Sequence, residues 1–200
     1  MNLLTHVAIA RILYDHFEKQ MELDRSAFIY GNIKPDLSCK LMRKAHIMEN
    51  YHDYVCSSSG ELMKNGRSLA EFSVELGQIC HYVCDFFCRY HLNREIFHDL
   101  GGHFLYELRL QYELWKLTRK DKLELDIYSR KARNDIASII FQMRSDYFSE
   151  AETINKDIYY AISTAIWVCE SVACFMVQPA GSVVENEEEL YTMLPLAGGQ

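Results

Sequence analysis

Proline is confined to three positions, Pro35, Pro179 and Pro195, so the long stretch from Asp36 to Gln178 contains none. Proline ends or kinks a helix, and glycine weakens one. A stretch of this length without proline and with few glycines is typical of helices joined by short loops. We also find no internal repeat and no convincing strand. The sequence therefore predicts an all-α protein.

Apolar periodicity and turn residues divide the chain into seven expected helices. Asp24 is expected to cap the second helix. The segment from Gly31 to Asp36 is expected to be a loop, because Gly31 suits a position just after a helix and Pro35 prevents continuation. The expected helices run approximately over residues 4–20, 24–30, 43–64, 68–90, 103–119, 122–147 and 155–177.

Composition indicates one folded domain. The chain has 200 residues, of which 49% are hydrophobic and 24% are charged. This is long enough to bury a core without disulfides and too apolar for disorder. We expect a single-domain helical bundle over residues 1–178 and a flexible acidic tail over 179–200. The formal net charge of −7 argues against a nucleic-acid partner.

Cysteine usage and the start of the chain predict a cytoplasmic protein. The seven cysteines are odd in number, which does not suit a disulfide framework. The segment after Met1 has no basic n-region, and His6 and Arg11 interrupt any apolar run, so no signal peptide is expected. The apolar run 161–177 is short for a membrane span and contains Glu170. We interpret it as a buried helix, with no transmembrane segment in the chain.

Two histidine–carboxylate pairs recur at helical spacing. His81 and Asp85 are four residues apart, and so are His103 and Glu107 on the next expected helix, with His91 between them. The pattern is H-x3-D-x5-H-x11-H-x3-E. Side chains four residues apart on a helix are neighbours, so one cation can contact both. A single pair would more simply be an ordinary surface feature, but two pairs on consecutive helices favour a metal site. Zinc suits these ligands, although other first-row metals accept them.

This spacing resembles that of the zinc-dependent phospholipase C family. The family includes bacterial phosphatidylcholine-hydrolysing enzymes and the catalytic domain of clostridial alpha-toxin, and its wider fold class includes the S1/P1-type nucleases. Thr5-His6 resembles the family's first histidine, and the segment from Gly31 to Asp36 followed by His46 resembles its early aspartate and histidine. The matching positions span residues 6–107, about half of the chain.

The resemblance implies an all-helical domain with two or three zinc ions in one cleft. Asp85 would bridge the first and third ions, and Asp36 would also be a candidate catalytic base. The implied ligands are Asp36, His46, His81 and Asp85 for the first ion, His91, His103 and Glu107 for the second, and His6 with Asp85 for the third.

The amino terminus departs from the family pattern. In the secreted enzymes a tryptophan amino terminus, exposed by signal cleavage, binds the third metal. Here Met1 lies only five residues before His6, and no cleavage is apparent. The third site is therefore expected to be absent, or to be completed by water or another side chain.

Other candidates are weighed against simpler interpretations. His52 could replace His46 as a ligand, but the order of Asp36 and His46 favours His46. His16 and His98 are expected at the surface, with a supporting position near His91 as the alternative for His98. Core packing is favoured over metal binding for the cysteines at 80, 84 and 88. A solvated loop is favoured over a phosphate-attracting rim for four basic residues, Lys34, Lys40, Arg43 and Lys44. Ordinary packing is favoured over a choline-binding pocket for four tyrosines, Tyr51, Tyr54, Tyr82 and Tyr106.

The function predicted from these residues is hydrolysis of a phosphodiester, with a phospholipid as the first substrate to test and possible peripheral contact with a membrane. Two alternatives stay open. One is a phosphodiesterase or single-strand nuclease with a non-lipid substrate. The other is a metal-binding helical interaction or sensory module without hydrolase activity.

Overall fold

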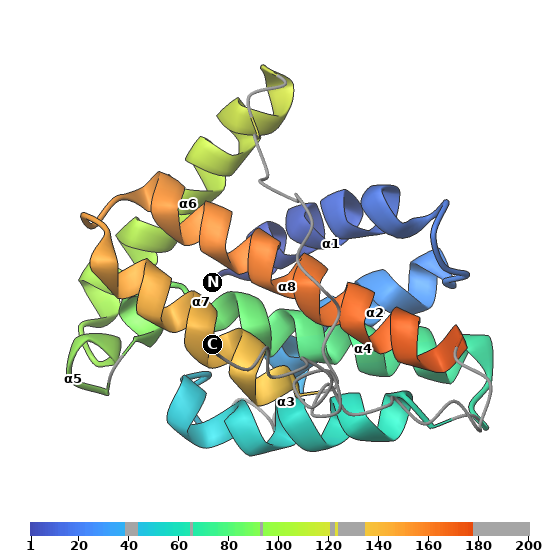
Figure 1. The fold of residues 1–200 in the computed structure, drawn as a ribbon. Coiled ribbons are helices and arrows are strands. Elements are labelled where there is room, and N and C mark those ends of the chain that lie inside the picture. Colours follow the sequence, from blue (N-terminus) through green and yellow to red (C-terminus); the bar gives the residue numbers. More distant parts are fainter. Residues whose placement is uncertain (39–43, 65, 93, 121–122, 124–134, 178–200) are drawn as a thin grey trace, which may run out of the picture.

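The computed structural model describes residues 1–38, 44–64, 66–92, 94–120, 123 and 135–177. Over these residues the protein is all-α, as predicted, with no strand. Figure 1 shows the helices arranged as one bundle. The elements are α1 (Leu3–Phe17), α2 (Arg25–Leu37), α3 (Met48–Leu62), α4 (Leu69–Asp85), the 3-10 helix η2 (Arg89–His91), α5 (Arg94–Phe97), α6 (Leu100–Arg119), α7 (Ile136–Ser149) and α8 (Ile154–Val177).

Helix starts are set by capping side chains. Asn2 accepts a hydrogen bond from the Thr5 backbone N–H, and Asp24 does the same for Ala27, as predicted for Asp24. Ser68 and Glu71 form a reciprocal capping box at the start of α4. Each such cap satisfies a backbone donor that has no partner inside the helix. The start of α1 is therefore anchored one residue after the chain begins.

The centre of the bundle is α4, which packs against α1, α2, α3 and α8. Every residue from Leu76 to Asp85 is buried, so the last turns of this helix are enclosed on all sides. The apolar run expected to be a buried helix forms most of α8, which packs on α4. Among the described helices, none combines the length and the apolar character that a membrane span requires.

The expected loop at 31–36 is wrong, because α2 continues to Leu37. Pro35 lies in its last turn, where it costs one backbone hydrogen bond. The helix persists because α2 lies directly against α4: a Cβ on Gly31 would stand 2.2 Å from the Val74 carbonyl oxygen, and one on Gly77 would stand 2.4 Å from that of Phe28. Gly31 therefore serves a close helix contact rather than a helix end.

Other boundaries also differ from the sequence prediction. Helix α4 ends at Asp85 instead of residue 90, and His91 lies on η2. Helix α6 begins at Leu100 because Asp99 caps it by accepting from the Gly102 N–H, so the glycine pair lies inside the first turn. The expected helical starts at residues 43 and 122, and the tail at 179–200, lie outside the described residues.

Candidate metal centre

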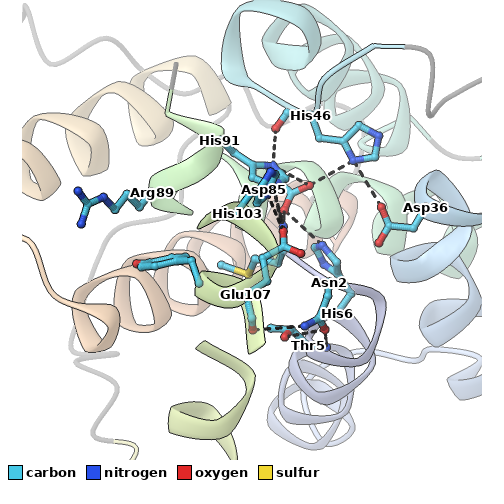
Figure 2. A network of polar contacts seen from close by, with 12 residues as sticks. Asn2, Thr5, His6, Asp36, His46, Asp85, Arg89, His91, His103 and Glu107 are labelled. Carbon is cyan, nitrogen blue, oxygen red and sulfur yellow. Dashed lines mark hydrogen bonds and ion pairs between the residues drawn. The ribbon is translucent and has the colours of Figure 1, made fainter. Parts of the chain in front are cut away.

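All eight predicted ligands lie in one cluster around the Met1 amine, and Figure 2 shows most of them. They come from five helical elements and one connecting segment, so no local stretch of chain forms the site alone. His6 lies on α1, Asp36 on α2 and His46 just before α3, while α4 carries His81 and Asp85, η2 carries His91, and α6 carries His103 and Glu107.

The first group is formed by Asp36, His46, His81 and Asp85. His46 Nδ1 lies 2.9 Å from His81 Nε2, 3.6 Å from Asp36 Oδ1 and 3.2 Å from Asp85 Oδ2. His81 Nε2 lies 3.7 Å from Asp36 Oδ1 and 3.4 Å from Asp85 Oδ2. Zinc ligands at about 2.0–2.1 Å in a tetrahedron are separated by roughly 3.3 Å. Each histidine nitrogen therefore lies at close to zinc-like spacing from the other and from one oxygen of each carboxylate.

The second group is formed by His91, His103 and Glu107. His91 Nε2 lies 3.0 Å from His103 Nε2 and 3.3 Å from Glu107 Oε1, and these last two atoms are 2.9 Å apart. The spacings again match three corners of a zinc tetrahedron. The Cys88 sulfur lies in the same region, with ligand atoms of Cys88, His91 and Glu107 within 4.8 Å of one another.

Asp85 connects the groups through its two oxygens. Oδ2 faces His46 and His81, whereas Oδ1 faces His6 Nε2 at 3.3 Å and the α-amino group of Met1. The carboxylate is fully buried. A carboxylate whose two oxygens face different ligand sets can bridge two cations and offset their mutual repulsion.

Two histidines are oriented by backbone carbonyls. His81 Nδ1 lies 2.8 Å from the Asn32 carbonyl oxygen, and His91 Nδ1 lies 3.1 Å from that of His46. Because a carbonyl only accepts, each Nδ1 carries a proton, which leaves Nε2 as the nitrogen that faces the cluster and can bind a metal when it is unprotonated. This is the usual arrangement around metal-bound histidines.

His6 offers a direct test of whether a metal fits. Its side chain is fully buried, and neither ring nitrogen forms a hydrogen bond with any of the described residues. Leaving buried polar nitrogens without a partner is costly. A cation between His6 Nε2 and Asp85 Oδ1 would give that nitrogen a partner, so the residues present fit a metal centre.

The Met1 amine lies at the third site, which the sequence predicted to be absent or completed by water or another side chain. It contacts Asp85, and its nitrogen lies 3.1 Å from His91 Nε2 and 3.2 Å from Glu107 Oε1. Asn2 holds it there, because the Asn2 side chain donates to the Glu107 carbonyl oxygen and to Gln111. The sequence offered one signal for this position, because only two residues precede α1. The direction in which these two residues run, however, depends on their contacts with α6.

The charges of the cluster set the ionisation of its acids. Burial opposes ionisation of Asp85, but the positive charges of His91, the Met1 amine and His6 outweigh it and hold the pKa of Asp85 well below its usual value. Burial likewise opposes ionisation of Glu107, and the same amine and the histidines lower its pKa.

Burial raises the pKa of Asp36. The pKa of His81 is lowered, first by burial and then by His6. Neutral imidazoles beside ionised carboxylates are the states that bind cations.

A cavity of about 370 Å³ opens beside the cluster. Ligands of both groups line it, together with Lys44, Leu3 and Phe97. Asp36 is the most accessible carboxylate of the first group, with 22% of its side chain exposed, while Asp85 is inaccessible. A substrate in this cavity would therefore reach Asp36 and not Asp85.

The remaining histidines lie outside the cluster. His52 contacts Asp53 and Cys56, whereas His46 contacts His81 and Asp85. His16 lies near Glu170, and His98 is exposed.

The cysteines and tyrosines mostly serve packing. The cysteines at 80, 84 and 88 are buried, with Cys80 in sulfur contact with Cys169. Tyr51 and Tyr82 stack on each other beside His46. Tyr54 donates to Glu75, and Tyr106 donates to Asp157. Of the basic candidates, Lys34 lies on α2 and Lys44 lines the cavity, whereas residues 40 and 43 lie outside the described residues.

Comparison with known proteins agrees with this geometry. The zinc-dependent phospholipase C family matches residues 5–154, which include every predicted ligand from His6 to Glu107. No curated protein and no solved structure gives a significant match. The family match covers well over half of the chain, and the protein belongs to the zinc-dependent phospholipase C family.

Proposed function

We propose that this protein is a zinc-dependent phosphodiester hydrolase of the phospholipase C type, acting on a phospholipid. The observation that carries the proposal is the convergence of eight distant histidine and carboxylate side chains at zinc-like spacings beside a cavity. Zinc ions held there would withdraw charge from a phosphodiester and lower the pKa of a nearby water.

Asp36 is the proposed catalytic base. It lines the cavity, and burial raises its pKa, which makes it a better proton acceptor than an ordinary aspartate. Its Oδ1 faces His46 and His81, so one oxygen would help to hold the first ion while the carboxylate takes a proton from the attacking water. Lys44, also on the cavity wall, would attract the phosphate charge.

The proposed ligand set is the one that the sequence predicts, with the Met1 amine added. His91, His103 and Glu107 would hold the second ion. His6 and Asp85 would hold the third, and the Met1 amine, unprotonated when it binds a metal, would complete that site. Two or three ions per chain are therefore expected.

The test is elemental analysis paired with a substrate panel on one preparation, purified without chelator. We expect at least two zinc-like ions per chain and release of phosphorylated headgroup from lecithin vesicles. An Asp36→Asn variant should keep the fold and lose hydrolysis. Fewer than two ions per chain would contradict the multi-metal centre.

Two other functions remain as outcomes of the same panel. Cleavage of single-stranded DNA or of a chromogenic diester, without cleavage of lecithin, would indicate a non-lipid phosphodiesterase. The acidic net charge weighs against the nuclease. A zinc-loaded protein that cleaves none of the substrates would indicate a metal-binding interaction or sensory module.

We further propose a cytoplasmic location. Among the described cysteines, none is in a disulfide, and the Cys80 and Cys169 sulfurs lie 3.3 Å apart without a covalent bond. The odd number of cysteines in the chain does not suit a disulfide framework, and free thiols are the rule in a reducing compartment.

A further inference from the structure

Helix α6 exposes a row of large apolar side chains. The α6 outer face consists of Phe104, Leu105, Leu108, Tyr112 and Trp115, and these side chains are between 43% and 62% exposed. At helical spacing they fall within an arc of about 100°. Contiguous apolar surface of this kind generally marks an interaction site.

The opposite face of the same helix already packs on the core. Leu110 and Leu114 are buried, and Tyr106 and Leu117 pack against the core cluster. Helix α6 is therefore apolar on two faces, whereas a surface helix normally has only one. Figure 1 shows that its carboxyl-terminal end extends beyond the body of the bundle.

Basic side chains border the α6 outer face. Lys116 and Arg119 lie over aromatic rings of that face: Lys116 Nζ is 5.4 Å from the Tyr112 ring centroid, and Arg119 Cζ is 4.8 Å from that of Trp115. Arg109 and Lys120 are exposed on the same helix and just after it. Glu113, the acid nearest to them on this part of the helix, is bonded to Lys116. A locally basic surface on a chain of net charge −7 is complementary to an anionic partner.

The composition favours a lipid surface as that partner. Tryptophan and tyrosine combined with lysine and arginine are typical of helices that lie in the membrane interface, where rings enter the headgroup layer and cations reach phosphates. A second copy of the chain fits less well, because a two-fold contact would bring the basic side chains near their own copies.

We propose that the α6 outer face is a docking surface for an anionic lipid bilayer. The inner face of the same helix supplies His103 and Glu107, so the docking surface and the metal cluster share one rigid element. The purpose of this docking rests on the proposed lipid hydrolysis, but the binding itself does not require catalysis.

The test uses the zinc-loaded full chain and two kinds of vesicle, phosphatidylcholine alone and phosphatidylcholine mixed with phosphatidylserine. Binding is measured by co-sedimentation and by tryptophan emission. The chain has two tryptophans, of which Trp167 is buried, so a blue shift on binding reports Trp115. Soluble chromogenic diester hydrolysis is followed in parallel, which separates docking from chemistry.

We expect tighter binding to the anionic vesicles, a blue shift, and weaker binding at high salt. The double variant Tyr112→Ser, Trp115→Ser should bind about tenfold more weakly or worse, while its hydrolysis of the soluble diester stays unchanged. The matched control is Phe141→Ser, Phe148→Ser on α7, which removes two similarly exposed rings, one of them also beneath an arginine. This control should bind vesicles like the native protein.

Equal vesicle binding by the two double variants would overturn the proposal. The proposal would also be overturned if the native protein bound no vesicles and instead formed a dimer that the Tyr112→Ser, Trp115→Ser variant does not form. That result would assign the face to self-association. Vesicle binding that needs the α6 outer face, in a protein that cleaves no diester, would support the docking surface and reject the proposed function.

Discussion

The contact between Gly31 and Gly77 is the part of the fold on which the first metal group depends most directly. Ordinary helix propensity favours alanine over glycine by about 1 kcal/mol, so Gly77→Ala in an open helix would stabilise the protein. Here the new Cβ would stand 2.4 Å from the Phe28 carbonyl oxygen and 2.9 Å from both the Asn32 nitrogen and the Gly31 Cα. These are backbone atoms, which cannot rotate away.

The size of the effect follows from these distances. Real Cβ contacts essentially never fall below 3.0 Å, so α2 must retreat by at least 3.0 − 2.4 = 0.6 Å. Overpacking of this kind costs about 1–3 kcal/mol, which offsets or outweighs the gain in propensity. Moving α2 away from α4 would lengthen the 2.8 Å hydrogen bond between His81 Nδ1 and the Asn32 carbonyl oxygen. It would also move Asp36 away from His81. We therefore expect a net loss of up to about 2 kcal/mol together with weaker zinc binding.

The assay is urea denaturation together with zinc titration of the purified variants. Gly60→Ala on α3 is the matched control, because nothing lies within 4 Å of its added Cβ. This control should be more stable by about 0.5 kcal/mol and should bind zinc normally. A Gly77→Ala protein that is as stable as the native chain, with equal zinc affinity, would refute the reasoning.

Four other outcomes are expected. Asp85→Asn should lower the metal content by at least one ion per chain, because a neutral amide cannot bridge two cations; unchanged zinc in elemental analysis would reject the bridge. Chelation should lower the melting temperature by about 10 °C if zinc is held a thousandfold above its Kd, and an unchanged melting curve after confirmed metal loss would contradict this. One residue added before Met1 should remove one ion, since the amine is buried, and intact native metal content would exclude it as a ligand. Tyr147→Phe should cost about 1–3 kcal/mol by removing a donor to buried Asp157.

The last of these predictions has a defined pH dependence. Burial raises the pKa of Asp157, so the folded state bears the cost of the ionised carboxylate above that pKa and loses this cost as the pH falls through it. The Tyr147 hydroxyl donates to the ionised form, and removing it should matter less once the carboxyl is protonated. The destabilisation by Tyr147→Phe, measured by denaturation, should therefore shrink as the pH is lowered. A constant difference across that range would contradict the assignment.

The sequence by itself determined the helical class, the ligand types and much of their spacing. His81 with Asp85, and His103 with Glu107, are one helical turn apart, so each pair is neighbouring in any structure that keeps those helices. The spacing also identified the family before any geometry was known. A local period is enough for such pairs, because it depends only on the backbone repeat.

Tertiary structure decided how the pairs meet. The expected loop at Gly31–Asp36 is helical, because close contact with α4 outweighs the hydrogen bond lost at Pro35. The position of the Met1 amine depends on Asn2 and α6, which are joined by side-chain contacts across more than 100 residues of sequence. Likewise, the α6 outer face is exposed because the opposite face of this helix packs on the core, and only the tertiary structure decides which of the two faces is covered. Such features arise from packing between distant segments, and neither the periodicity nor the spacing of residues within one segment encodes them.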